Sequence, residues 1–446
     1  MNIITLKFLS IIIFVSIINA LPINHEFRAS WVITWEYISA TQTSGETMER
    51  IDEIMDNHSL ANMTAVFFQA RQSGTSYYNS SFEPWGYHTG YTNPGFDPLE
   101  YAIEAAHDRG LELHAWFNVF QASSMHEGAP AQVHPEWVCR DRDGEPMASN
   151  RSLSPGLESV RDYTIDVAME IVNNYDIDGL HLDYVRWNEY SNNSLSNLPE
   201  NQIEEIHMID GIISDEALAV IEDTRTGRYL YDIDHSYSGG VPDDFSNWEE
   251  WWRSGVTTFV SDLHDSIQTV KPYVRLSAAV LGRYNWGGWQ GYGTVYQDGA
   301  LWLNEGFVDQ LTPMHYHWTT PTSFAQMLSG SNESWSPYIQ QGINQGRLFT
   351  AGPGSYVLAE QNLWNNHNGI VNAVRNIQFV DGFQFFSNGT WEDYQYWEEA
   401  GHTFFKDKSI VRNITEYENN SESPPNPSAI LNQINELEYQ INISTN

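Results

Sequence analysis

The stretch Asp178-Gly-Leu-His-Leu-Asp-Tyr-Val-Arg-Trp187 is a short apolar run with polar side chains at alternating positions. Alternate residues of a strand share a face, so His181 and Asp183 point to one side while Leu180 and Leu182 point to the other. In a parallel α/β barrel the C-terminal ends of the strands are where catalytic side chains gather, because the loops leave the packed core there. The stretch therefore predicts a barrel strand that carries Asp183 to the mouth of the barrel.

The chain contains eight short apolar runs of this kind, and each is followed by a helix-like segment. Eight such units in succession predict an α/β fold, a closed (β/α)8 TIM barrel. The clearest helix follows the second run, where Asp97 is a capping residue, Pro98 suits the first turn, Glu100 completes a capping box and Gly110 ends the helix. The runs are Phe27 to Trp35, Ala65 to Arg71, Leu111 to Asn118, Asp178 to Trp187, Arg275 to Gly282, Asp309 to Trp318, Arg347 to Val357 and Asp381 to Ser387.

Composition changes divide the chain into three parts. Residues 1–20 carry one lysine and a short apolar run before Ala20, which is typical of a secretory signal peptide and predicts a secreted or extracytoplasmic protein; a retained anchor is the alternative. Residues 24–410 are expected to form the barrel, with a long polar insertion after its fourth strand at 188–246. Residues 411–446 are rich in Asn, Ser, Glu and Pro and predict a flexible linker followed by a short helix. With no second long apolar segment, no stable membrane span is expected in the mature form.

The excess of acidic residues limits the classes of molecule that the protein can bind. Lysine and arginine total 21 against 58 acidic residues, a formal charge of −37, so a nucleic acid or another polyanion is an unsuitable partner. Cys139 is the only cysteine, which excludes an intramolecular disulfide and a cysteine-based zinc site. We expect neither a cofactor nor a metal ion.

Polar side chains recur near the C-terminal ends of the first four predicted strands, where a sealed core would have Val or Leu. Buried polar groups destabilise a protein unless they are paired, so their joint presence predicts a functional site rather than a core. Strand alternation places them in same-face pairs: Thr34 and Glu36, Gln69 and Arg71, His114 and Asn118, and His181 and Asp183.

Short motifs follow one another along the chain in a specific order. They are Phe27-Arg-Ala-Ser-Trp-Val-Ile-Thr-Trp-Glu-Tyr, Val66-Phe-Phe-Gln-Ala-Arg, Phe82-Glu-Pro-Trp, Gly95-Phe-Asp-Pro-Leu, Glu104-Ala-Ala-His-Asp-Arg-Gly-Leu-Glu-Leu-His-Ala-Trp-Phe-Asn, His134-Pro-Glu-Trp, Leu153-Ser-Pro-Gly, Val160-Arg-Asp-Tyr, the Asp183 strand, Pro242-Asp-Asp, Leu276-Ser-Ala-Ala-Val and Pro313-Met-His-Tyr. This order of motifs resembles the glycosyl hydrolase-like 10 family of secreted barrel proteins assigned to glycan cleavage. The likeness runs from about Phe27 to Phe405, and departures from the family pattern occur at Ser154, Asn188 and His315.

The resemblance implies an oligo- or polysaccharide substrate and hydrolysis by two carboxyl groups, one protonated and one ionised. Asp183 is the first candidate, as the ionised group, with His181 and Arg186 favouring its charge. Glu36 is the second candidate, because the adjacent Trp35 favours a raised pKa; the two roles are interchangeable at this stage. Asp243, Asp244 and Glu360 remain alternatives for the second acid.

Other side chains around these acids are expected to bind the sugar. Amide, imidazole and guanidinium groups suit hydroxyls, whereas flat aromatic rings suit the apolar faces of sugar rings. The candidate substrate-binding residues are Gln69, Arg71, His114, Asn118, His181, Tyr184, Arg186, His315, Tyr316, Trp286 and Trp289.

Two other functions compete. A metal-dependent deacetylase or amidohydrolase would use His181 and Asp183 with His114, His315 and His317 as ligands, although the first strand lacks a His-X-His pair. A non-catalytic carbohydrate-binding barrel would bind glycan without turnover. Resistance of the activity to chelators argues against the first alternative, and release of new sugar ends argues against the second.

Overall fold

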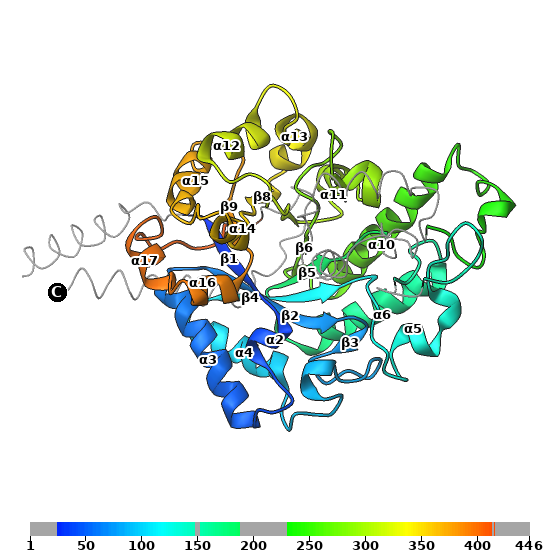
Figure 1. The fold of residues 1–446 in the computed structure, drawn as a ribbon, viewed down its shortest axis with the longest axis horizontal. Coiled ribbons are helices and arrows are strands. Elements are labelled where there is room, and N and C mark those ends of the chain that lie inside the picture. The colour runs from blue at the N-terminus through cyan, green and yellow to red at the C-terminus, as the bar shows by residue number, and fades with distance from the viewer. Residues whose placement is uncertain (1–24, 148–151, 188–229, 413, 415–446) are drawn as a thin grey trace, which may run out of the picture.

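The computed structural model describes residues 25–147, 152–187, 230–412 and 414. Within these residues, eight parallel strands form a closed barrel, because β1 pairs with β2 on one side and with β9 on the other (Figure 1). The predicted (β/α)8 fold is therefore confirmed, and each of the eight apolar runs contributes one strand. The strands are β1 (Phe27–Val32), β2 (Ala65–Gln72), β4 (Glu112–Asn118), β5 (Gly179–Asp183), β6 (Arg275–Ala278), β7 (Gln310–Leu311), β8 (Leu348–Ala351) and β9 (Gly382–Phe385); the short β3 (Thr75–Ser76) adds antiparallel to β2.

The strands are buried on both faces, which explains why they read as nearly continuous apolar runs. Inward-facing side chains such as Trp31, Phe67 and Trp116 pack together inside the barrel. Outward-facing neighbours such as Phe68 and Phe117 pack in a second, larger cluster that includes side chains of the surrounding helices. The inside of the barrel is therefore a packed core below its mouth.

Helix starts follow the capping signals in the sequence. The predicted second helix is α4 (Pro98–His107), and the Asp97 side chain accepts hydrogen bonds from the backbone N–H groups of Leu99 and Glu100. Gly110, at φ +70°, follows three residues after the helix ends. The other helical elements are α2 (Thr34–Tyr37), α3 (Ser44–Leu60), η1 (Tyr87–Thr89), α5 (Pro130–Val133), η2 (Pro135–Trp137), α6 (Glu158–Asn174), η4 (Tyr237–Gly239), α10 (Trp248–Val270), η5 (Gly291–Val295), α11 (Gly299–Glu305), α12 (Pro321–Ser329), α13 (Ser336–Asn344), α14 (Ser355–Glu360), α15 (Asn366–Val374), α16 (Asn388–Asp393) and α17 (Trp397–His402).

The first strand ends earlier than predicted. β1 stops at Val32 and the helical turn α2 begins at Thr34, so Thr34 and Glu36 are not alternate residues of a strand. The turn is held by tertiary contacts, since the backbone N–H of Thr34 donates to Gln69 Oε1 on β2. Expecting Thr34 and Glu36 on one strand face was therefore wrong.

Several predicted segments lie outside the described residues. These are the signal peptide at 1–20, nearly all of the tail at 411–446, and residues 188–229 of the insertion. The described part of the insertion, 230–246, pairs through Tyr231 with Arg140. None of the helices in the described residues has the length and apolar composition needed to cross a membrane.

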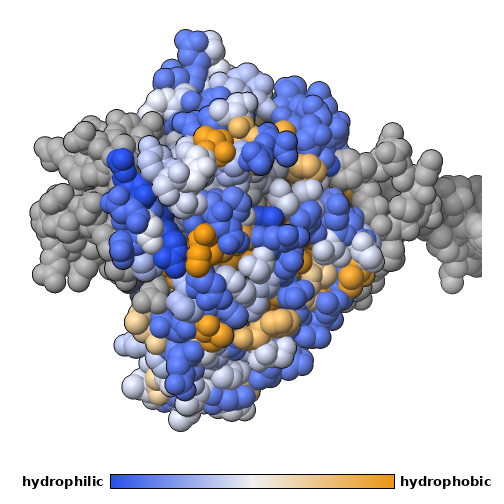
Figure 2. Space-filling view, turned by 90° about the vertical axis from the view of Figure 1, so that its right-hand side faces the viewer, coloured by the Kyte–Doolittle hydropathy of each residue, from blue (hydrophilic) through white to orange (hydrophobic). Residues whose placement is uncertain are grey.

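The arrows of β2 and β4 in Figure 1 point to the right-hand side, and Figure 2 looks onto that side. Hydrophobic side chains form separate small patches there among hydrophilic ones (Figure 2). The mouth side of the barrel is therefore mainly polar, as expected for a surface that meets a hydrated ligand.

Candidate active site

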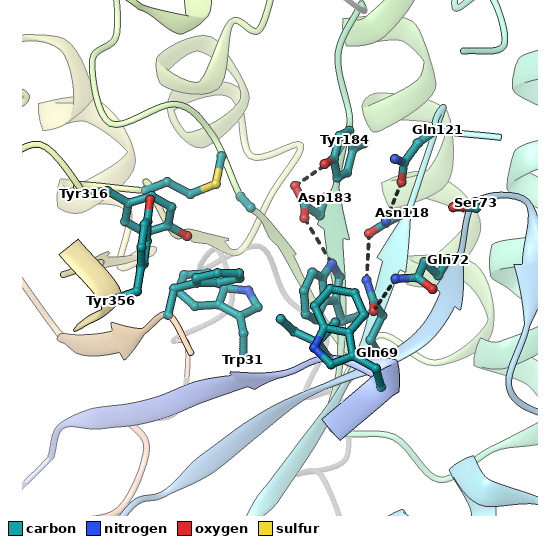
Figure 3. Close-up of a pocket in the computed structure, with 16 residues that line it drawn as sticks. Trp31, Gln69, Gln72, Ser73, Asn118, Gln121, Asp183, Tyr184, Tyr316 and Tyr356 are labelled. Atoms are coloured by element: carbon teal, nitrogen blue, oxygen red, sulfur yellow. Dashed lines mark hydrogen bonds between the residues drawn. The ribbon is translucent and has the colours of Figure 1, made fainter. Parts of the chain in front are cut away.

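A cavity of about 260 Å³ lies at the C-terminal ends of the strands, and its residues come from β1, β2, β4, β5 and the loops after β6 to β9 (Figure 3). Asp183 is the only acidic side chain among the described residues that line it. The lining residues are Trp31, Ile33, Trp35, Gln69, Gln72, Ser73, Trp116, Asn118, Gln121, Asp183, Tyr184, Ala279, Met314, Tyr316, Tyr356 and Phe386.

Asp183 is held at the end of β5 by donors to both of its oxygens. Trp116 Nε1, from the neighbouring β4, donates to Oδ2 at 3.2 Å, and the backbone N–H of Tyr184 donates to Oδ1 at 2.7 Å (Figure 3). Tyr184 has φ +50°, which is unusual for a residue other than glycine and marks a backbone under local constraint. The chain leaves the strand in a conformation that fixes the Asp183 carboxylate at the edge of the cavity.

One wall of the cavity is a chain of side-chain amides. Gln72 Nε2 donates to Gln69 Oε1 at 3.3 Å, Gln69 Nε2 to Asn118 Oδ1 at 3.5 Å, and Asn118 Nδ2 to Gln121 Oε1 at 2.9 Å. The chain spans the ends of β2 and β4 and lies next to Asp183 (Figure 3). Because each amide has two N–H groups and an oxygen with two lone pairs, the wall keeps donors and acceptors for a polar ligand.

The facing wall is aromatic. Tyr316 lies 5.6 Å from both Tyr356 and Phe386 between ring centroids, and Trp31 lies 5.8 Å from Phe386. In Figure 3 Trp31, Tyr316 and Tyr356 face Asp183 and the amides across the cavity. An amphipathic ligand with one apolar face and a polar edge fits between these two walls.

Glu36 lies away from the cavity lining. Its Oε2 accepts from the backbone N–H of Ile33 at 3.1 Å, and its Oε1 accepts from Ser387 Oγ at 3.1 Å and from the backbone N–H of Gly389 at 2.9 Å. Burial raises the pKa of Glu36 to about 7, in the direction that the sequence predicts. In this structure, however, the carboxyl group joins α2 to the start of α16 rather than facing Asp183.

The comparisons with known proteins agree with this architecture. The sequence model of the family described as glycosyl hydrolase-like 10 matches residues 26–348. The chain belongs to the glycosyl hydrolase-like 10 family.

Two curated relatives are similar to this family member. The glycosyl hydrolase YngK of Bacillus subtilis is 26% identical over 319 residues, which cover 66% of this chain and 54% of that protein. The glycosyl hydrolase DigH of Escherichia coli K12 is 24% identical over 332 residues, 66% of each chain. The chain thus spans roughly half to two thirds of these relatives. Among solved structures, the glycoside hydrolase domain of PgaB from Bordetella bronchiseptica aligns with a TM-score of 0.50 at 13% identity, covering 88% of this chain and 100% of that domain, and shares the fold.

His181 lies below the mouth of this family barrel. It accepts from Trp31 Nε1 through Nε2 at 2.9 Å, so its Nδ1–H donates to Ser277 Oγ at 2.9 Å. It is fully buried and stacks on Phe67 at 3.9 Å between centroids. Burial holds the pKa of His181 well below its ordinary value, so the ring is neutral. The expectation that its charge favours ionised Asp183 was wrong; His181 instead orients Trp31.

Arg71 and His114 do not line the cavity either. Arg71 forms a fully buried ion pair with Glu83 and also donates to the backbone carbonyl of Val119 at 2.8 Å. His114 contacts Glu112 at 3.0 Å through Nε2, deeper in the barrel. The structure therefore places both side chains in structural contacts away from the cavity lining, and their role as sugar ligands stays a prediction.

The predicted ligands from later loops divide into two groups. Tyr316 lines the cavity as expected, and so do Gln69, Asn118 and Tyr184, which lie on β2, on β4 and directly after β5. The remaining four do not: His315 is buried beside Trp335, Trp286 and Trp289 are buried in packing, and Arg186 lies 4.8 Å over the Tyr184 ring.

His315, the family departure, has its Nδ1 bonded to the backbone N–H of Gly352 at 3.1 Å, and burial lowers its pKa to about 3. It therefore acts in packing behind the cavity. Ser154, a second departure, donates to Asp232 at 2.8 Å in another buried contact, and Asn188 lies outside the described residues.

The structure does not assemble the ligand set of the metal-dependent alternative. His114 and His181 both pack against Phe67 but form hydrogen bonds with different partners, Glu112 and Ser277, while His315 accepts from the backbone of Gly352. Within the described residues no group of three or more His, Cys, Asp and Glu side chains is arranged to hold a metal ion.

Sequence reasoning missed several residues that line the cavity. Trp31 and Trp116 read as core, and Gln72, Gln121 and Tyr356 lie at strand ends or in loops where periodicity gives no signal. The Gln-rich spacing of Gln69 and Gln72 was the one available hint, since glutamine is uncommon in a buried strand.

Proposed function

We propose that this family member is a secreted glycoside hydrolase that cleaves O-glycosidic bonds in a polysaccharide or a cell-surface glycan. The observation that carries the proposal is the position of Asp183, whose carboxylate reaches a sugar-sized cavity between an aromatic wall and an amide wall. Family membership supports a carbohydrate substrate.

The two walls suit a pyranose ring. The C–H faces of a sugar pack on the aromatic wall, while its hydroxyls exchange hydrogen bonds with the amides of Gln69, Gln72 and Asn118. Asp183 lies beside the amide wall and faces the aromatic wall across the cavity (Figure 3). In this proposal, the glycosidic oxygen and the anomeric carbon of the bound sugar lie at the Asp183 carboxylate.

Asp183 serves as the ionised carboxylate in this proposal. Its oxygens accept from Trp116 Nε1 and from the backbone N–H of Tyr184, and N–H donors of this kind stabilise a carboxylate. It either attacks the anomeric carbon or activates water, and a second acid protonates the leaving oxygen. Among the described residues the other candidates, Glu36, Asp243, Asp244 and Glu360, do not line the cavity, so Asp183 is the residue on which the test depends.

The test is incubation of the purified protein with a panel of polysaccharides and mass spectrometry of the released reducing ends. Asp183→Asn keeps the size of the side chain and removes its charge, and it should reduce the release of ends by at least about a thousandfold. Asp265→Asn, an exposed acid on α10, is the matched control and should retain the wild-type rate. Wild-type turnover by a folded Asp183→Asn protein would remove Asp183 from the mechanism.

A non-catalytic glycan-binding barrel is the second candidate, because the described cavity lining contains one acid instead of a pair. The same panel separates the two functions. Retention of a polysaccharide without new reducing ends, by wild-type protein as well as by Asp183→Asn, favours binding alone.

Export is the remaining part of the proposal and depends on residues 1–20 of the sequence. N-terminal sequencing of the protein recovered from culture medium or periplasm should begin shortly after Ala20. Recovery of the intact N-terminus in the cytoplasm would contradict export.

A further inference from the structure

A row of five rings begins at the rim of the cavity; two of them are exposed and three are half-buried. Trp35 lines the cavity and its side chain is 52% exposed, and its ring lies 5.9 Å from His88 between centroids. From His88 the row continues to Tyr87 at 5.2 Å, to Tyr91 at 6.1 Å and to His126 at 4.9 Å. We call these five residues the aromatic strip.

The strip is built on anchored loops. The backbone N–H of Gly86 donates to the Ser76 carbonyl on β3, and the N–H of Tyr91 donates back to the Gly86 carbonyl. A Cβ atom at Gly86 would lie 2.3 Å from the Tyr77 ring, so only glycine lets η1 pack this closely. The rings are therefore presented to solvent by a fixed backbone rather than by a loose loop.

Tyr87, at 68%, is the most exposed large hydrophobic side chain in the described residues. Covering the Tyr87 ring with a ligand would be favourable, because the ring is apolar and exposed in the described structure. The neighbouring His88 ring, by contrast, already packs against Tyr77. The hydroxyls of Tyr87 and Tyr91 and the imidazoles of His88 and His126 also give the strip hydrogen-bonding groups along its length. Flat apolar faces with polar edges match a row of sugar rings.

We propose that the aromatic strip binds the continuation of the glycan chain whose reacting sugar occupies the cavity. Continuity supports this occupant, because Trp35 belongs to both the cavity lining and the strip. Size supports it too: a cavity of about 260 Å³ is at the lower limit for ligand sites, so a polymer must extend beyond it. The formal charge of −37 disfavours a polyanion and favours a neutral or amino-sugar chain.

The inference rests on the proposed function, and a binding assay separates the two. Asp183→Asn protein is run in native gels that contain glycol chitin, hydroxyethyl cellulose, xylan or pullulan. The strongly acidic protein migrates well without ligand, and retardation by a polysaccharide measures binding. At least one of the four polymers should retard it. The added changes Trp35→Ala and Tyr87→Ala should raise the dissociation constant at least about tenfold for that polymer.

The matched control adds Tyr394→Ala, which removes a ring that is 48% exposed just after α16, and should bind like Asp183→Asn alone. Undiminished retardation of the Trp35→Ala/Tyr87→Ala protein, or no retardation of Asp183→Asn by any of the four polymers, would overturn the strip. Wild-type protein incubated with the same polymers reports on cleavage separately. Binding that depends on the strip, without new reducing ends, would support glycan binding by the strip and contradict the proposed hydrolase activity.

Discussion

Replacing Glu83 with glutamine should destabilise the barrel by about 3 to 5 kcal/mol, although Glu83 does not line the cavity. Its carboxylate accepts from Arg71 Nε at 2.8 Å and from Arg71 Nη2 at 2.5 Å, and both side chains are completely buried. Glutamine keeps the shape but removes the negative charge. The Arg71 guanidinium is then left in the interior without a counter-charge, and the cost of burying it appears as lost stability.

The same arginine also organises the cavity. Arg71 Nη1 donates to the backbone carbonyls of Asn118 and Val119, at the end of β4 where the amide wall begins. A displaced Arg71 should therefore reduce glycan binding as well as stability. The double change Arg71→Met with Glu83→Leu removes both charges and should recover much of the lost stability without restoring the contacts to β4.

Urea denaturation followed by tryptophan fluorescence and circular dichroism measures the free energy of unfolding. Glu53→Gln is the matched control, because Glu53 pairs with Arg50 at 2.8 Å on the surface with its side chain 63% exposed. That change should cost less than about 1 kcal/mol. If Glu83→Gln costs no more than Glu53→Gln, the interpretation of the Arg71 pair as a buried structural anchor is wrong.

Three further predictions concern the pKa of Glu36, the hydrogen bond from Trp116 to Asp183, and the hydrogen bond from His181 to Ser277. Burial raises the pKa of Glu36 to about 7 against an ordinary value near 4.5, so folding favours its protonated form. As pH rises from 4.5 to 7, the free energy of unfolding of the wild-type protein should therefore fall by about 1 to 3 kcal/mol relative to that of Glu36→Gln. If urea denaturation shows the same pH dependence for both proteins, the prediction is wrong. Trp116→Phe removes the N–H donor to Asp183 and should lower kcat by about 10- to 100-fold in the reducing-end assay; an unchanged kcat would show that the donor does not matter. Ser277→Ala removes the acceptor of the His181 Nδ1–H and should lower the free energy of unfolding in urea by about 1 to 3 kcal/mol. The control Ser266→Ala should cost less, because Ser266 is half-buried on α10 and donates only to the Asp262 carbonyl of its own helix.

The barrel was predictable because its strands are apolar on both faces. Runs such as Ala65 to Arg71 and Leu111 to Asn118 are bounded by turns and helix caps, so their number and order follow from local signals. The end of β1 was not predictable in this way. Trp35 and Glu36 continue the strand-like alternation, and the contact that turns the chain at Thr34 comes from Gln69 on another strand.

The position of Asp183 at the cavity was predictable because a carboxylate at the end of an apolar strand has few structural explanations. The positions of Arg71 and His114 away from the cavity lining were not predictable. Their partners, Glu83 for Arg71 and Arg275 near His114, are set by the fold, and no pattern along the chain links His114 to Arg275. Whether a polar residue on a strand binds ligand or a neighbour thus depends on contacts that alternation does not reveal.

The register between strands helps to distinguish polar side chains that reach the cavity from those that pack inside the barrel. On β4 three inward-facing residues succeed one another: His114 pairs in register with Gly179, Trp116 with His181 and Asn118 with Asp183. A Cβ at Gly179 would lie 2.2 Å from His114 Nδ1, so the lowest layer is closed by packing. The middle layer holds Trp116, which donates upward to Asp183.

Asn118 and Asp183 of the top layer line the cavity with polar groups, and Trp116 of the middle layer lines it too, whereas His114 and His181 do not line it. On β4 and β5, a polar side chain is therefore a ligand candidate at the last inward-facing position of its strand and a structural residue in the layers below. On β2 the criterion does not hold, because Gln69 lines the cavity although it is in register with Trp116. The rule separates Asp183 from His181, which share a strand face and lie only two residues apart. The orientation of the groups at the mouth depends on the layers beneath it, because Trp31 Nε1 donates to the buried His181 and Trp116 Nε1 donates to Asp183.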